Sequence, residues 1–238
     1  MSAFMYGVVL QWKLDIRSKS LLVTCYVVPL LFFAVMGGIF TSINPGAKYT
    51  LIQSMTVLGV STGALVGLPP SLVEIYGSDI KKVYKANGVP LYLGMVSMFL
   101  SAFIHILIMC TIIYIVAPIA FDAALPASLP LYFVSLAAFI AVSLSIGCVL
   151  GLSVKNQAKL TMISQVIFLP SIMLSGIMLP VDLLPVFFKI AGKIFPATWG
   201  YKMMTDDTFY FGSLWPLAAI LFGSIIVCIF LLKRLQKT

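Results

Sequence analysis

The stretch LSGIMLPVDLLP, residues 174–185, decides how the last third of this chain is folded. An almost uncharged apolar run that starts at Thr161 has by then continued for roughly the thickness of a bilayer. Pro180, Asp182 and Pro185 interrupt the run, yet apolar residues resume at once. The chain therefore either leaves a membrane here or turns back inside it.

The composition is typical of an integral membrane protein. Of the 238 residues, 61% are hydrophobic and 9% are charged, and the mean hydropathy is +1.12, whereas soluble domains carry about 25% charged residues. A crossing helix needs about 20 apolar residues, so the chain has room for about six crossings with short loops. We therefore predict an all-α polytopic membrane protein with one transmembrane domain over residues 1–238 and no room for a second, soluble domain.

Six apolar runs fit these crossings, separated by turn signals and short polar segments. We expect Pro69 and Pro70 to end the second run, because proline disrupts hydrogen bonding in a helix interior. The first run is longer than the apolar core of a signal peptide, so we take it as a retained span. The predicted spans are about Leu21–Phe40, Leu51–Leu68, Leu91–Ala117, Leu131–Leu152, a fifth that starts near Thr161, and Ser213–Leu232.

Residues 1–19 predict a helix that lies along the membrane surface. Apolar side chains, among them Val9 and Trp12, recur there at helical spacing, while Gln11, Asp15 and Ser18 fall on the opposite side. A helix with two such faces lies in the interface plane.

The basic residues predict the orientation, since cytoplasmic loops of membrane proteins retain Lys and Arg. With the N-terminus inside, all but four of the 15 basic residues, Lys48, Lys189, Lys193 and Lys202, fall on the cytoplasmic side. This bias predicts both termini in the cytoplasm, and it makes the positive charge a sign of topology rather than of nucleic-acid binding. The cytoplasmic residues are then Lys13, Arg17, Lys19, Lys81, Lys82, Lys85, Lys155, Lys159, Lys233, Arg234 and Lys237.

Glycines recur at four-residue spacing in two of the spans. Gly59, Gly63 and Gly67 stack on one side of the second span, and Gly147 and Gly151 do so in the fourth. A second helix backbone can approach closely where side chains are missing, and this contact drives helix association in lipid. We predict that these five glycines are helix-packing positions.

Residues 71–88, between the second and third spans, predict a well-bounded amphipathic helix. Ser71 with Glu74 forms a capping box and Asn87-Gly88 is a stop signal, so a helix over about Leu72–Ala86 is expected. Its apolar and lysine-rich faces fit two roles. The helix either lies on anionic headgroups or docks a cytoplasmic partner.

The sequence FLPSIMLSGIMLPVDLLPVFFKIAGKIFPATWGYKMMTDD, residues 168–207, resembles the signature region of the ABC-2 type permeases, which export drugs, peptides, polysaccharides and lipids. The resemblance covers essentially the whole chain. It implies that short re-entrant helices, residues 180–196, dip back into the outer leaflet before the last span; an amphipathic helix on the outer surface is the alternative. The residues that match the family's Ser-Gly and spaced prolines are Ser175, Gly176, Pro180, Pro185 and Pro196.

The resemblance also favours the docking role for residues 71–88. The segment follows the family's order of an acidic residue, a glycine, an amphipathic helix and a terminal G-x-P. The family's usual acid-Arg-acid and Gly-Thr pattern is, however, reduced here to VEIYGSD. By resemblance this segment couples the permease to an ATPase. The expected coupling residues are Glu74, Tyr76, Ile80, Lys81, Lys82, Tyr84, Lys85 and Gly88.

No GxxxxGK[ST] motif occurs, so we expect an ABC ATPase subunit of separate sequence to bind ATP and Mg²⁺. This chain is then not an enzyme, and we expect no cofactor, catalytic residue or metal site in it. The resemblance further implies a second permease copy or a paralogue, membrane lipid around both, and a bacterial plasma (inner) membrane. It places spans two and five near the substrate pathway, whose candidate lining residues are Gln53, Thr56, Ser61, Thr62, Gln165, Phe168, Ser171, Met173 and Ser175.

The expected substrate is hydrophobic or amphipathic, such as a drug, an antimicrobial peptide or a lipid-like compound. The competing hypothesis is a stand-alone ion-coupled carrier or channel, against which stands the lack of acidic residues in the predicted spans. A membrane-embedded enzyme is a third hypothesis, without its usual motifs HExxH or GxSxG. We expect His105, deep in a span, to serve in hydrogen-bonded packing, and the four cysteines to act as small hydrophobes.

Overall fold

The computed structural model describes residues 3–178, 181–206 and 211–237. Most of these residues are helical, and no β-strand occurs among them. Six of the described helical segments are long and apolar enough to cross a membrane, which confirms the prediction of an all-α polytopic protein. Three residues of the predicted signature, Leu179, Pro180 and Asp207, lie outside the described residues.

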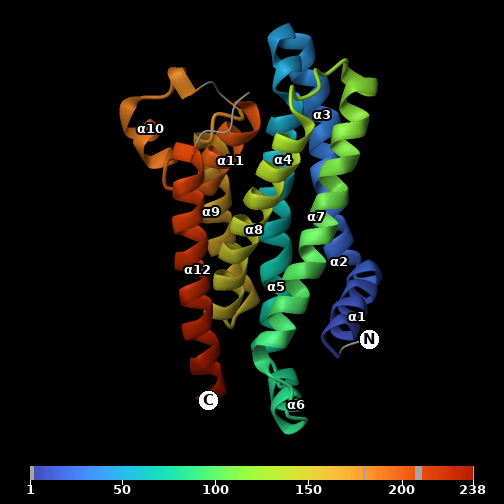
Figure 1. Ribbon diagram of the computed structural model, residues 1–238, viewed down its shortest axis with the longest axis vertical. Coiled ribbons are helices and arrows are strands. Elements are labelled where there is room, and N and C mark those ends of the chain that lie inside the picture. The colour runs from blue at the N-terminus through green and yellow to red at the C-terminus, as the bar shows by residue number, and fades with distance from the viewer. Residues whose placement is uncertain (1–2, 179–180, 207–210, 238) are drawn as a thin grey trace.

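The N-terminal segment leads into the first span and packs beside the third. Helix α1 (Ala3–Arg17) is followed by α2 (Lys19–Leu22), the π-helical turn η1 (Val23–Val27) and α3 (Val28–Ile43), and a 3₁₀ turn, η2 (Pro45–Tyr49), ends the span. In Figure 1, α1 lies against the lower half of the bundle beside the third span. The first span is therefore continuous with the surface helix that precedes it.

The second span is longer than the sequence predicted. Helix α4 (Leu51–Thr62) continues through a second π-helical turn, η3 (Gly63–Gly67), into α5 (Leu68–Tyr76). The prediction that Pro69 and Pro70 end this span is wrong. Both prolines fall in the first turn of α5, directly after the wide turn η3, where a missing N–H costs little.

The predicted single helix over Leu72–Ala86 is also wrong, because the chain breaks at Gly77 and resumes as α6 (Ile80–Ala86). A Cβ on Gly77 would lie 2.5 Å from the carbonyl oxygen of Val73. The Ser78 hydroxyl donates to the Glu74 carbonyl at 2.6 Å and accepts from the Ile80 N–H at 3.3 Å. The Ser78 side chain thus takes over backbone bonding at the break, and the Ser71–Glu74 pair lies inside α5 instead of capping a new helix.

The remaining spans are α7 (Leu91–Phe121), α8 (Leu129–Ser153), α9 (Gln157–Leu174) and α12 (Phe211–Lys237). The first three contact α4, whereas α12 packs mainly on α8. Every residue of α4 is buried, whereas most of α12 is exposed on its outer side. Helix α6 and both chain ends lie in the lower part of Figure 1, where most of the lysines and arginines are found, and we call this the basic end.

Two short helices fold back between α9 and the last span. After the 3₁₀ turn η4 (Val181–Leu183), helix α10 (Val186–Gly192) returns to the end of α9, where a Cβ on Gly192 would lie 2.7 Å from the Leu174 carbonyl oxygen. Helix α11 (Pro196–Thr205) then runs beside α8.

The contact of α11 with α8 lies well inside the bundle. Gly200 packs on the ring of Phe139, which is ten residues, or about 15 Å of helix, from the start of α8. The Ser135 hydroxyl donates to the Met203 carbonyl at 3.4 Å. The chain has therefore turned back along the spans before it starts α12; how deeply this segment enters a leaflet stays a prediction.

The predicted packing glycines lie at helix–helix contacts. A Cβ on Gly147 would overlap the Ala64 carbonyl oxygen, and one on Gly151 would lie 2.6 Å from the Cβ of Leu72. These two positions bring α8 against the central span. On another side of that span, the nearest side chains to Gly59, Gly63 and Gly67 are those of Met109, Ile106 and Cys25 respectively.

We expect Gly147→Ala to lower the thermal unfolding temperature of the protein in detergent. The added methyl group meets a backbone carbonyl that has no room to move, and overpacking of this kind typically costs about 1–3 kcal/mol. Gly223→Ala in α12 is the control, since nothing lies within 4 Å of its Cβ position. Equal melting temperatures for both variants would contradict a tight α8 contact.

Candidate transport groove and coupling end

A groove runs between the first and fifth spans, with the central span as its floor. Its cavity has a volume of about 470 Å³ and is mostly apolar. No ionisable side chain lines it among the described residues. We call it the α3–α9 groove. Its lining residues are Thr24, Val28 and Phe32 from η1 and α3, Leu58, Thr62 and Val66 from α4 and η3, and Gln165, Phe168, Leu169, Ile172, Met173 and Met178 from α9 and beyond.

A second, more polar cavity continues from this groove toward the end opposite the basic end. Its volume is about 600 Å³, and Met178 lines both cavities. The walls come from the outer ends of α3 and α4 and from the segment after α9. Asn44, Thr50, Ser54 and Tyr201 supply polar side chains there. The polarity of the walls therefore increases from the α3–α9 groove to the second cavity.

The nine predicted pathway residues fall into different surroundings. Thr62, Gln165, Phe168 and Met173 line the α3–α9 groove. Gln53 instead lines a cavity of about 30 Å³ near the opposite end, and Thr56 shares a hydrogen bond of 2.8 Å with the Tyr132 hydroxyl. The remaining three, Ser61, Ser171 and Ser175, are buried and line none of these cavities.

Helix α6, in the predicted coupling segment of residues 71–88, forms the tip of the basic end (Figure 1). Ile80 and Val83 are exposed on α6 although both are apolar. Lys82 is exposed beside them and pairs with Asp79 at 2.7 Å, which lowers the pKa of the Asp79 carboxyl. Helix α6 thus presents apolar and basic side chains together, with Glu74 and Gly88 also exposed nearby.

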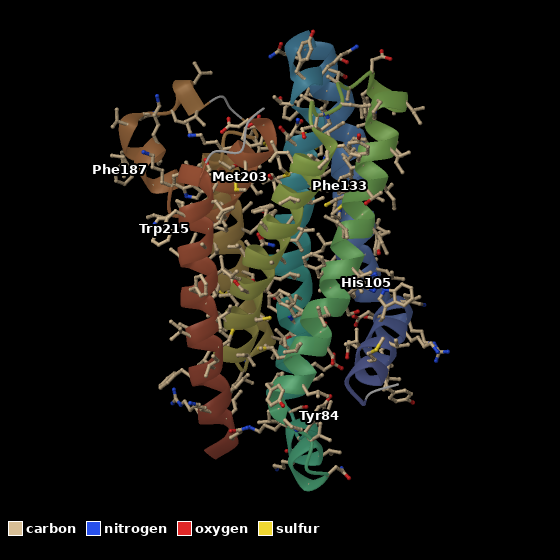
Figure 2. All side chains as sticks on the ribbon, viewed as in Figure 1. Tyr84, His105, Phe133, Phe187, Met203 and Trp215 are labelled. Atoms are coloured by element: carbon tan, nitrogen blue, oxygen red, sulfur yellow. The ribbon has the colours of Figure 1, made fainter. Side chains whose placement is uncertain are left out.

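Two predicted coupling residues point inward. The Tyr76 hydroxyl is buried and donates to the Leu91 carbonyl at 2.5 Å. The ring of Tyr84 is half-buried beside Gly94 of α7 (Figure 2). Tyr76 therefore holds α5 to the start of α7 instead of facing a partner. Lys81 is half-exposed. The side chain of Lys85 is not among those that the structure describes.

The comparison with known families agrees with this architecture. The model of the ABC-2 type transporter family matches residues 3–209. The chain belongs to the ABC-2 type transporter family. It is thus a membrane component of ABC-type transport, and association with an ABC ATPase is a general property of this family. A search of curated proteins found no match.

The permease also contains a buried polar cluster that the sequence did not predict. Asp15 was expected on the polar side of α1, but it is buried against α7. Its carboxylate accepts hydrogen bonds from the Ser101 hydroxyl at 2.5 Å and the Gln11 amide at 2.8 Å. The physical reason for the error is that α1 packs its polar side on small residues of α7, among them Ser97 beside Gly7.

His105 belongs to the same cluster (Figure 2). Its Nδ1 shares a hydrogen bond of 2.8 Å with the Tyr26 hydroxyl, and its ring lies 6.0 Å from that of Trp12. The histidine therefore joins α1, η1 and α7, as the packing interpretation predicted. The Gln11–Asp15 spacing of four residues was the signal for the cluster, since it puts both side chains on one helix face.

Among the described residues, no group of three or more His, Cys, Asp and Glu side chains is placed to hold a metal ion. The four cysteines are free and buried.

We expect the Asp15 cluster to give the permease a specific pH dependence. Burial raises the pKa of the Asp15 carboxyl above its ordinary value of 3.8, against the opposing effect of its hydrogen bonds and of His105. A carboxyl with a raised pKa holds its proton more strongly in the folded state, so stability increases as the pH falls through the range just above 3.8. The melting temperature of the wild type should therefore rise, relative to that of Asp15→Asn, as the pH is lowered from 7 toward about 4. Parallel curves for the two proteins would contradict a buried Asp15.

Proposed function

We propose that this chain is the permease subunit of an exporter that moves a hydrophobic or amphipathic substrate across the plasma membrane, with energy from an ABC ATPase on a separate polypeptide. The supporting observation is the connection between α6 and the groove. Helix α6 follows the central span after the short break that begins at Gly77, and the same span supplies Leu58, Thr62 and Val66 to the groove floor. A movement imposed on α6 therefore acts on the end of the span whose middle part forms the groove floor.

The basic end is the proposed docking site for the ATPase, which makes it cytoplasmic. The exposed apolar side chains of α6 lie beside lysines, a combination that suits a protein partner with an acidic rim. Tyr76 ties the end of α5 to α7, and the Ser78 hydroxyl bonds to the backbone on both sides of the break between α5 and α6. Closure of an ATPase dimer would then tilt the central span against its neighbours.

The groove chemistry sets the proposed substrate class. Drugs, antimicrobial peptides and lipid-like compounds are the candidates, because the described walls offer apolar contacts with few hydrogen-bonding groups such as Thr62 and Gln165. A fully charged substrate would lose its hydration there without a partner. The more polar second cavity fits release toward water at the opposite end.

A second permease copy or a paralogue is proposed to close the groove from the side. Met162, Val166 and Met173 are exposed along α9, and Leu31 and Val35 are exposed along α3. These flanking apolar faces suit either lipid or a second permease. Pairing across them would enclose the substrate between two central spans.

We expect an ATPase of separate sequence to copurify with the tagged chain from its own host. Replacing the exposed residues Ile80, Lys82 and Val83 with Ala should abolish that copurification, since it removes the outward face of α6. The matched control changes two exposed lysines to Ala, Lys155 in the loop before α9 and Lys159 in the first turn of α9. A chain that purifies alone and transports without ATP would instead support the stand-alone ion-coupled carrier or channel.

Filling the groove should block transport while ATPase binding is retained. Met173→Trp adds a large ring at the groove wall, and we expect ATP-driven uptake of uncharged amphipathic dyes into inverted vesicles to fall about tenfold, the effect of about 1.4 kcal/mol. Ile226→Trp in α12 is the control, because Ile226 is also exposed but belongs to neither the groove nor the proposed pairing face. Equal uptake by both variants would show that the substrate pathway lies outside the α3–α9 groove.

A further inference from the structure

A second membrane-level groove lies on another face of the bundle, between α7, α8 and α12. Its volume is about 320 Å³. None of its lining residues belongs to the first, second or fifth span, so it is separate from the α3–α9 groove. We call it the α7–α12 groove. Its lining residues are Met95, Val96, Phe99 and Leu100 of α7, Ser145 and Cys148 of α8, and Ile225, Cys228 and Ile229 of α12.

The walls of this groove are apolar throughout. Its one hydroxyl group, on Ser145, already donates to the Val142 carbonyl at 2.7 Å within α8. Ile225 and Ile229 are partly exposed at the rim, on the side where α12 faces the surroundings of the bundle. A polar ligand would find no hydrogen-bonding partner in such a groove, whereas a hydrocarbon chain would lose nothing by entering it.

The groove has a basic mouth at the basic end of the bundle. Ile225, Ile229 and Lys233 follow one another at intervals of four residues in α12, so they lie on one helix face. Lys233 is exposed one turn beyond the groove, and Arg234 follows it. On α7, the exposed Tyr92 lies one turn before Val96 on the groove side. An ammonium group and a phenol hydroxyl therefore flank the mouth of an apolar groove.

We propose that the α7–α12 groove binds one anionic phospholipid, with an acyl chain along Val96, Ile225 and Ile229 and the phosphate at Lys233. Lysine side chains reach from a helix end to the headgroup layer, and basic pockets between membrane helices attract anionic headgroups. The positive charge of Lys233 selects an anionic headgroup, and the apolar walls hold the acyl chain. This proposal is independent of the export function, because the two grooves share no residue.

The lipid has a structural consequence for the last span. Helix α12 packs along α8 and α11 but touches α7 at few positions. A lipid acyl chain in the α7–α12 groove fills the gap between α7 and α12. The bound lipid thus fixes α12 against the third span, which the protein contacts alone do only weakly.

The first test is native mass spectrometry of the full chain in detergent, titrated with palmitoyl-oleoyl phosphatidylglycerol. We expect one tightly retained lipid on the wild type and its loss in Ile225→Trp, which fills the groove. Ile226→Trp is the matched control, since this neighbouring isoleucine is exposed but does not line the groove. Equal retention of the lipid by the two variants would overturn the proposal.

The second test concerns the headgroup and uses a surface variant that leaves the helix packing intact. Lys233→Gln should reduce the preference for phosphatidylglycerol over phosphatidylcholine about fivefold, the effect of one basic residue near a membrane surface. Lys155→Gln, an exposed lysine at the same end, should leave the preference unchanged. Equal binding of the two lipids by the wild type would overturn the proposal. So would efficient crosslinking between copies through a cysteine placed at Ile229, because a second copy would then cover this face.

Discussion

The close approach of the central span to α8 is the constraint on which the rest of the bundle depends. Gly147 and Gly151 bring α8 onto the backbone of η3 and α5, so near that the Ala64 carbonyl occupies the space of a side chain. Lipid and protein interior are about equally apolar, so packing of this kind holds membrane helices together where hydrophobic burial does not. With α8 in place on one side, α3, α7 and α9 complete the surroundings of α4.

The two π-helical turns give the central part of the protein its shape. Turns η1 and η3 pack on each other, with Cys25 of one turn beside Gly67 of the other. Each turn also supplies groove residues, Thr24 from η1 and Val66 from η3. Turns of this kind are frequent at functional sites because they disturb the regular hydrogen bonding of a helix. Here the second turn lets the span continue through Pro69 and Pro70 to the basic end.

The polar groups of the bundle are divided between its parts. The α3–α9 groove contains no described ionisable residue, whereas the lysines of α6 and α12 gather at the basic end. The buried acid, Asp15, lies outside both grooves, where Ser101 and Gln11 satisfy its oxygens. Helix α1 is thereby attached to the third span by a side-chain hydrogen bond, one of the interactions that associate membrane helices.

The number of spans, the basic end and the positions of the packing glycines could be read from the amino-acid sequence, because crossing length, charge and the absence of a side chain are local properties. The folded structure was needed to show which face of each helix is buried. Hydropathy does not separate a face in lipid from a face in protein, since both are apolar. For this reason four of nine predicted pathway residues line the groove, while Thr56 bonds to Tyr132 in the interior. The burial of Asp15 could not be predicted either, since its partner Ser101 comes from a helix more than 80 residues away along the chain.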